Sequence, residues 1–315
     1  MDNKLDVLVV GELNVDLILN KIDSFPEMGK EKLADEMTLT LGSSSAIFAS
    51  NLSSLGAKVG FIGKIGKDSF GDLVVDSLKE KKVNTDFIIS DDNLKTGATI
   101  VLNYDEDRAM VTHPGAMEEL TIDDISSEQL ATAKHLHISS IFLQPKIKEN
   151  IFDLLVKAKK AGLTTSLDPQ WDPNEKWDID LRKLLPFIDV FLPNETEIAH
   201  LTNEPDVEKS LKMLDPFANL IVVKMGSKGS ALLRNGNISI QPAYLNEKVV
   251  DAIGAGDSFD AGFISKFVRN ESPIECQRFG NLCGAINTTA AGGTGAFSDY
   301  EKMKEISIKN FGVKI

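Results

Sequence analysis

The amino-acid sequence predicts an α/β fold in which helices cover both faces of a central sheet and a smaller sheet projects from it. Short apolar runs alternate with stretches of helical spacing along most of the 315 residues, which is typical of such a fold. The chain is 42% hydrophobic and 26% charged, as soluble globular proteins are. A chain of this length can bury roughly three-quarters of its unfolded surface. These observations argue against disorder, a collagen helix and a coiled coil.

Each predicted strand is a short apolar run. The strands are Val7–Gly11, Val59–Ile62, His135–Ile138, Thr164–Asp168, Val190–Pro193 and Leu220–Lys224. The clearest predicted helix begins near Pro145 and stops at Gly162, with one apolar stripe between them. Another covers Phe70–Val83 and has a lysine-rich last turn, which suits the helix dipole. Two long helices close the chain, from about Gly256 to Arg269 and from Pro273 to Ala290.

Two segments interrupt this alternation. Leu17–Leu41 and Thr96–Thr112 have extended patterns with turn residues and no helical spacing. Strands from both segments can form a small sheet that projects from the main one, which is a natural cover for a binding site. We therefore expect residues 1–315 to form one domain, with lid segments at about 17–41 and 96–112.

The charge of the chain narrows its partners. With 34 Lys and Arg against 47 Asp and Glu, the formal net charge is −13 at pH 7. This balance argues against nucleic acid and against an anionic membrane, because both need a cationic surface. A nucleotide that carries its own Mg²⁺ stays compatible with it. The charged start does not resemble a signal peptide and no apolar run reaches transmembrane length, so we expect a cytoplasmic protein.

The cysteines and histidines are interpreted as structural. Cys276 and Cys283 lie seven residues apart in a helical stretch, and two cysteines cannot build a disulfide framework or a metal cage. We expect both to be buried thiols. The four histidines have no metal-ligand spacing.

The most informative stretch, Asp251–Gly262, places three small residues before an acid. Gly254, Ala255 and Gly256 let the backbone approach a ligand closely, and the N–H groups and the positive end of the following helix then point at one place. Such a turn is an anion hole, and Asp257 at its mouth is suited to act as a base. The alternative is that Asp257 only caps the helix, but a cap does not need the small residues.

Two further clusters follow predicted strands. Gly226 and Gly229 come after the strand that ends at Lys224, and their turn can border a nucleotide because ligands gather beyond the carboxyl ends of strands in such sheets. The alternative is a plain hairpin. Asn194 and Glu197 lie three apart at a helix start, and their oxygens suit hydrated Mg²⁺. Taken alone, this pair is better explained as a capping box.

Small polar residues near the start of the chain suit a polyol. Asn14 and Asp16 are two apart on one face of an extended segment, where an amide and a carboxylate can hold adjacent hydroxyl groups. The alternative is an edge strand in water. Gly42 and Ser43 belong to a run of small residues before a helix, which either surrounds a ligand or only starts the helix.

The order of these motifs resembles the PfkB/ribokinase family of carbohydrate kinases. The resemblance spans almost the whole chain, and its most specific part is the motif that contains Gly254–Asp257. It implies a ribokinase-like fold, with a Rossmann-like, mostly parallel sheet, flanking helices and a small β-sheet lid. It also implies an ATP-dependent kinase that phosphorylates a hydroxyl group of a sugar or related polyol.

The resemblance assigns a role to each motif. Asp257 would be the catalytic base, and Gly254–Gly256 the anion hole. Asn194 and Glu197 would order Mg²⁺ and its waters. The ATP-side residues would be Asp168, Asn194, Lys224, Gly226 and Gly229. The sugar-side residues would be Asn14, Asp16, Gly42 and Ser43. A monovalent cation such as K⁺ would be held by Asp251, Ile253 and Gly295.

The sequence departs from the family mainly at the acceptor end. Ser43 and Ile47 stand where the family has a glycine and an asparagine, so the usual grip on ribose is in doubt. Ala252 replaces the usual threonine beside Asp251, and Asp168–Asp172 alters the usual run of aspartate, asparagine and arginine. The phosphate-side motifs are better kept than the sugar-side ones.

Several alternatives stay open at this point. A nucleoside kinase of the same fold would stack a base on lid aromatics, for which Phe25 and Tyr104 are the candidates. A kinase of sugar phosphates would need cations such as Lys30 or Arg108. A non-catalytic sugar sensor would have no use for Asp257. Pairing of two lids into a homodimer, as in some relatives, is a further hypothesis.

Overall fold

The computed structural model describes residues 4–104 and 107–315, and in these ranges the strands form two sheets. The main sheet has nine strands in the order β13-β12-β11-β10-β9-β8-β1-β4-β5, and the second has four in the order β3-β2-β6-β7. The strands are β1 (Leu5–Val10), β2 (Asn14–Ile22), β3 (Ala34–Leu41), β4 (Val59–Gly66), β5 (Asn84–Asp91), β6 (Gly97–Tyr104), β7 (Asp107–His113), β8 (Ala133–Ser139), β9 (Thr164–Asp168), β10 (Val190–Phe191), β11 (Ile221–Lys224), β12 (Ser230–Arg234) and β13 (Asn237–Gln241).

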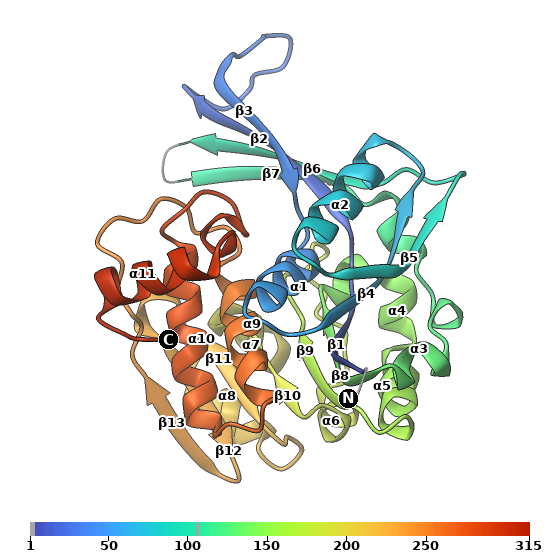
Figure 1. Ribbon diagram of the computed structural model, residues 1–315, viewed down its shortest axis with the longest axis vertical. Helices are drawn as coiled ribbons and strands as arrows, with labels where there is room; N and C mark the ends of the chain where they lie inside the picture. The colour runs from blue at the N-terminus through green and yellow to red at the C-terminus, as the bar shows by residue number, and fades with distance from the viewer. Residues whose placement is uncertain (1–3, 105–106) are drawn as a thin grey trace.

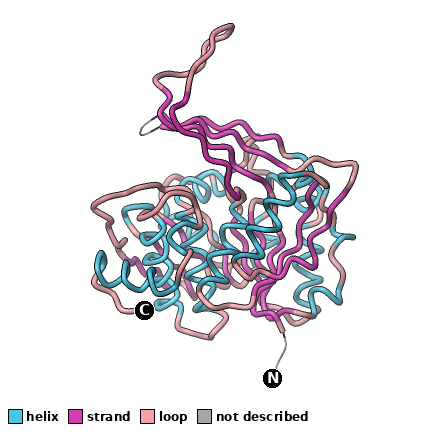
Figure 2. Tube along the Cα trace, turned by 45° about the horizontal axis from the view of Figure 1, so that its top comes forward, coloured by secondary structure: helices cyan, strands magenta, loops and turns pink. Residues whose placement is uncertain are grey.

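Helices cover both faces of the main sheet (Figures 1 and 2). The α-helices are α1 (Ser44–Ser54), α2 (Ser69–Glu80), α3 (Ser127–Ala131), α4 (Pro145–Glu149), α5 (Ile151–Lys160), α6 (Leu181–Leu184), α7 (Glu195–Thr202), α8 (Val207–Leu214), α9 (Ala255–Phe267), α10 (Pro273–Asn287) and α11 (Tyr300–Phe311). Strand β1 shows how they pack, because its side chains alternate between the two faces. Val7 and Val9 join a core with α1, α2, α9 and α10, whereas Leu8 and Val10 join a core with α4, α5 and α8.

The main sheet is parallel from β5 to β11 and antiparallel at β12 and β13. Each of the six predicted strands falls on one of these strands, although β10 stops two residues earlier than expected, at Phe191. The turn at Asn235 and Gly236 joins β12 to β13, as a plain hairpin does.

The single helix expected after Pro145 is wrong, because two helices occupy this segment. Helix α4 ends at Glu149 and α5 begins at Ile151. Between them, the side-chain amide of Asn150 donates to the Lys146 carbonyl at 3.0 Å, which satisfies the end of α4. Asparagine competes with the helix ladder in this way. The apolar stripe remains buried across the break, so periodicity alone could not reveal it.

The four-stranded sheet projects from the main body, at the top of Figures 1 and 2. It combines β2 and β3 from one segment with β6 and β7 from another, and β2 pairs in parallel with β6. The two segments that interrupt the α/β alternation therefore build one sheet.

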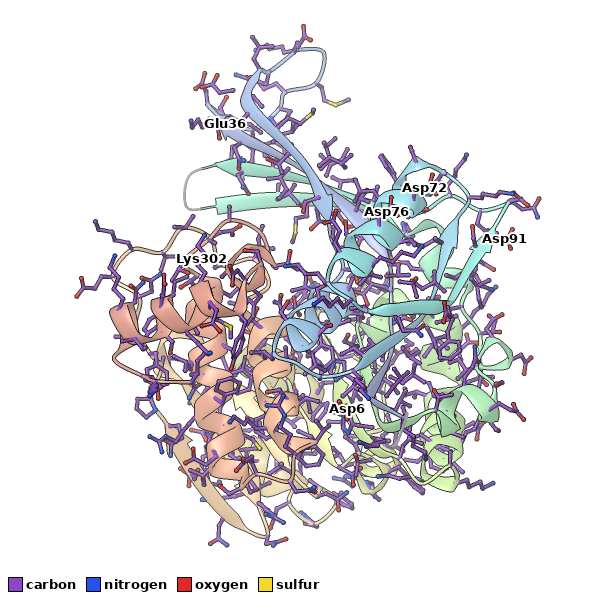
Figure 3. All side chains as sticks on the ribbon, viewed as in Figure 1. Asp6, Glu36, Asp72, Asp76, Asp91 and Lys302 are labelled. Atoms are coloured by element: carbon purple, nitrogen blue, oxygen red, sulfur yellow. The ribbon has the colours of Figure 1, made fainter. Side chains whose placement is uncertain are left out.

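Acidic side chains are spread over the surface. Glu36 lies on β3, and Asp72 and Asp76 lie one helical turn apart on the exposed side of α2 (Figure 3). Cys276 and Cys283 are free thiols buried against α9, as expected. No helix in the described part of the chain has the length and apolar character that a membrane span requires.

Candidate active site

A cavity of about 1200 Å³ lies between the lid and the carboxyl ends of the parallel strands. Lid strands β6 and β7 contribute Thr99, Val101, Met110 and Thr112 to its wall. Most of the residues predicted for a site line it together: Asn14, Asp16, Ser43, Asn194, Glu197, Lys224, Gly226, Gly229, Ile253, Gly254, Ala255, Gly256 and Asp257. Gly42, Asp168, Asp251 and Gly295 are not part of its wall.

The glycine-rich turn leads directly into α9. Gly254 has a φ of 74°, which favours glycine, and a Cβ there would come within 2.6 Å of the Gly293 Cα. Within the described ranges, the N–H groups of Gly256 and Asp257 have no acceptor. The N–H of Ala255, however, donates to the Ala252 carbonyl at 3.2 Å, so it closes the turn and was wrongly expected to be a free donor.

Asp257 is 7% exposed, and its carboxylate faces the cavity. Burial raises its pKa well above the ordinary value, and the negative charge of Asp168 raises it further, while Lys224 opposes both effects. The Oδ1 atom accepts a hydrogen bond of 3.0 Å from the Gln170 amide. A carboxylate with a raised pKa is a better proton acceptor at neutral pH than an exposed one.

Lys224 forms a buried ion pair with two acids. Its Nζ lies 2.8 Å from Asp168 Oδ2 and 2.9 Å from Asp260 Oδ2. Burial acts to lower the pKa of Lys224, but the charges of Asp168 and Asp260 outweigh it and the pKa is raised. A Cβ on Gly256 would lie 3.8 Å from this ammonium group, so the positive charge is directly beneath the glycine-rich turn.

Asn194 and Glu197 form a capping box and also line the cavity, so both interpretations hold. Glu197 Oε2 accepts from the Asn194 N–H at 2.9 Å, and Oε1 accepts from its side-chain amide at 2.6 Å. Burial and the charge of Asp168 raise the pKa of Glu197 to about 7. In the described ranges no three His, Cys, Asp or Glu side chains could hold a metal ion together. One buried carboxylate beside phosphates fits Mg²⁺ that keeps most of its waters.

The turn at Gly226 and Gly229 likewise satisfies both interpretations. It joins antiparallel strands β11 and β12, and it lines the cavity next to Lys224. Gly229 has a φ of 95°, and a side chain there would run into the Gln241 carbonyl. The glycine is therefore required by the hairpin itself, whatever lies in the cavity.

The predicted polyol side is organised around Asn14. Its side-chain amide donates to Asp16 Oδ1 at 3.1 Å and to Thr99 Oγ1 at 3.0 Å, which links β2 to β6. Gly42 packs against the Asp16 carboxylate, and no side chain would fit there. Ser43, at a φ of 70°, donates to the Glu12 carbonyl and caps α1. Serine in this left-handed region is strained, and such strain is concentrated at binding sites.

Four residues of the site were missed. Glu12 is buried in the cavity wall at the end of β1, and both its carboxylate oxygens accept from Ser45. Gln170 donates to both Asp168 and Asp257. Asp260 is the second partner of Lys224. Trp171 lines the cavity at 46% exposure. One usable signal was the three-residue spacing of Asp257 and Asp260 on a helix, which places both on one face.

The lid aromatics do not form a stacking platform for a base. Phe25 and Tyr104 pack on each other, with ring centroids 6.0 Å apart, and neither lines the cavity. Lys30 pairs with Glu27. The side chain of Arg108 lies outside what the structure describes.

The predicted monovalent-cation ligands do not fit a cation in this structure. The Ile253 carbonyl already accepts a 2.6 Å hydrogen bond from the Asn287 side-chain amide. The two Asp251 oxygens accept from the backbone N–H groups of Ile253 and Gly292. Gly295 begins a 3₁₀ turn, in which its carbonyl accepts from Ser298. These oxygens are bound by N–H donors rather than collected around one point.

Comparisons with known proteins agree with this geometry. A family model described as pfkB family carbohydrate kinase matches residues 4–299. Ribokinase of Arabidopsis thaliana is 29% identical over 319 residues, covering 95% of this chain and 80% of that protein.

Two solved structures share the fold. The structure of Arabidopsis thaliana ribokinase complexed with ribose and ATP has a TM-score of 0.81 and 26% identity, and the match covers 96% of this chain and 98% of that one. A putative ribokinase II from E. coli in complex with ATP and Mg²⁺ has a TM-score of 0.84 and 22% identity, with 97% and 99% covered. The expected ribokinase-like fold is thus confirmed, and the chain belongs to the pfkB family of carbohydrate kinases.

Proposed function

We propose that this kinase transfers the γ-phosphoryl group of ATP to a hydroxyl group of a sugar or related polyol, with Asp257 as the general base. The observation that carries the proposal is the position of Asp257. Its buried carboxylate faces the cavity at the start of α9, beside the N–H groups of Gly256 and Asp257, which have no acceptor among the described residues. A proton acceptor and anion-binding donors thus meet at one place, as phosphoryl transfer requires.

The chain's own groups divide the work. Asp257 takes the hydroxyl proton while the oxygen attacks phosphorus. The N–H groups of Gly256 and Asp257, the positive end of α9 and the nearby Lys224 ammonium stabilise the charge on the phosphoryl oxygens. Mg²⁺, when bound beside Asn194 and Glu197, neutralises charge on the nucleotide phosphates.

The two substrates occupy different parts of the cavity in this proposal. ATP lies against Asn194, Lys224, Gly226 and Gly229, with Asp168 fixing Lys224 from behind. The acceptor lies against Asn14, Asp16 and Ser43, with Gly42 making room for the Asp16 carboxylate. The lid strands above the acceptor exclude water and so suppress hydrolysis of ATP.

We also propose that the chain acts as one kinase domain that pairs through its lid. A row of apolar residues crosses all four lid strands in register, namely Leu39, Leu17, Ile100 and Val111. It lies on the opposite face from Thr99 and Val101, which line the cavity. Leu39, Ile100 and Val111 are exposed, and a matching row on a second copy would cover them. Light scattering should give a dimer mass, and Ile100→Lys should give a monomer.

Replacing Asp257 with asparagine tests the central assignment. As loss of a general base, Asp257→Asn should lower turnover by roughly 10²–10⁴ while ATP still binds. Asp72→Asn, on the exposed side of α2, is the matched control and should leave turnover unchanged. A Asp257→Asn enzyme with near-normal turnover would remove Asp257 from this role.

The acceptor is best identified by ADP release across a panel of pentoses, hexoses, sugar acids, nucleosides and sugar phosphates. We expect turnover with a neutral sugar or polyol. Turnover confined to nucleosides would favour a nucleoside kinase. Sugar binding in isothermal titration without ADP release from any compound would favour a sensor.

A further inference from the structure

Three fully buried polar side chains lie beneath the glycine-rich turn. They are Asn51 on α1, Ser258 on α9 and Asn287 on α10. The Asn51 amide donates to Ser258 Oγ at 2.9 Å, and Ser258 Oγ donates to Asn287 Oδ1 at 2.9 Å. The Asn287 amide then donates to the Ile253 carbonyl at 2.6 Å. Each bond passes its donor in the same direction, so the chain of bonds ends on the residue before Gly254.

The same chain also reaches the backbone on which the turn rests. Asn51 uses its amide a second time, donating to the Gly293 carbonyl at 2.8 Å. Gly293 and Gly254 are so close that neither has room for a side chain beside the other and Ile47. The three polar residues therefore tie the turn, its supporting loop and helices α1, α9 and α10 into one unit. Aligned hydrogen bonds in a dry interior reinforce one another.

We propose that this Asn51–Ser258–Asn287 network positions the anion-hole turn in place of a monovalent cation, so that the reaction does not require K⁺. A cation would fix this turn by drawing the Ile253 carbonyl and the Asp251 carboxylate toward one positive charge. Here the partial positive charge of the Asn287 amide holds the carbonyl, and two backbone N–H groups hold the carboxylate. The inference rests on the proposed function, because it concerns the turn that would bind the phosphoryl group.

The unmodified enzyme gives the first test. At equal ionic strength, thermal unfolding should occur at the same temperature in KCl, NaCl and tetramethylammonium chloride, because a cation bound specifically to the native state would raise it. Turnover should be equal in the three salts. A K⁺-specific rise in unfolding temperature, or a tenfold gain in turnover with K⁺ over tetramethylammonium, would overturn the proposal.

Asn287→Ala gives the second test, with Gln277→Ala as its matched control. Gln277 is equally buried on the same helix, but its amide donates to Ser230 on β12 and not to the turn. We expect Asn287→Ala to lower kcat by up to about 10²-fold, as misplaced catalytic groups do, with little change in the KM for ATP. Gln277→Ala should keep kcat while losing stability. Equal kcat losses in both variants would assign Asn287 a merely structural role and overturn the proposal.

Two safeguards keep the tests separate. If Asn287→Ala does not fold, the salt series on the unmodified enzyme still decides, and Asn51→Ala offers a second break in the same chain of bonds. If Asp257→Asn keeps normal turnover, the proposed function fails. If instead Asp257→Asn is inactive and the unmodified enzyme needs K⁺, the function stands and this inference alone fails.

Discussion

Replacing Glu12 with glutamine should change the pH dependence of stability by a predictable amount. Glu12 is buried at the end of β1, where burial raises its pKa from 4.5 to about 7 despite the hydrogen bonds from Ser45. Glutamine has nearly the same shape. Ser45 Oγ lies 2.7 Å from Ser139 Oγ, so Ser45 can donate there and accept from the new amide. The variant therefore removes the titration while keeping the packing.

The sign and size of the effect follow from linkage. The folded state holds the Glu12 proton more tightly than the unfolded state does, so this stabilisation is complete below pH 4.5 and is lost as the pH rises through about 7. A shift from 4.5 to about 7 corresponds to about 3 kcal/mol in the free energy of unfolding. Relative to wild type, Glu12→Gln should thus gain up to about 3 kcal/mol between pH 5 and pH 8.

Urea denaturation of both proteins at pH 5, 6, 7 and 8 measures this gain. The control is Glu36→Gln, since Glu36 is an exposed acid on the lid whose loss should give parallel curves. If the wild-type and Glu12→Gln stabilities also stay parallel from pH 5 to pH 8, Glu12 is not a buried titrating group and the reasoning is refuted.

Three further substitutions have defined outcomes. Lys224→Met leaves the carboxylates of Asp168 and Asp260 buried without their cation, and urea denaturation should show a loss of about 3–5 kcal/mol; a loss below 1 kcal/mol would contradict the buried ion pair. Gly254→Ala places a Cβ at a φ of 74° and 2.6 Å from the Gly293 Cα, so it should cost at least about 1–2 kcal/mol in the same assay and lower kcat; an unchanged protein would show that the turn is loose. Glu197→Gln should raise the Mg²⁺ concentration for half-maximal turnover roughly 10–100-fold, measured by Mg²⁺ titration at fixed ATP, and an unchanged requirement would exclude Glu197 from the metal site.

Sequence patterns revealed the parts of the site that depend on neighbouring residues. The glycine-rich turn at Gly254–Asp257 and the pair Asn194 and Glu197 each span only a few positions, so backbone geometry and helix capping determine them locally. For Asn194 and Glu197, and for the turn at Gly226 and Gly229, the choice between a structural and a functional explanation was a false one. The same atoms close a turn and face the cavity.

The remaining contacts could not be predicted because they join residues far apart in the chain. Gln170 and Asp257 are 87 residues apart, and Asn51 and Ser258 are 207 apart. Such pairs meet only when the strand order of the main sheet is known. The break at Asn150 was hidden for a different reason, since a side-chain hydrogen bond interrupted the helix without altering its apolar stripe.

The division of the cavity between two sheets has a consequence for how this enzyme can change over evolutionary time. Asn14, Asp16 and Thr99 belong to the lid strands, whereas Asp257 and Lys224 belong to the main body. Mutations in the lid can alter which alcohol is accepted without touching the groups that handle phosphate. New acceptor preferences can therefore accumulate on a phosphoryl-transfer apparatus that stays constant.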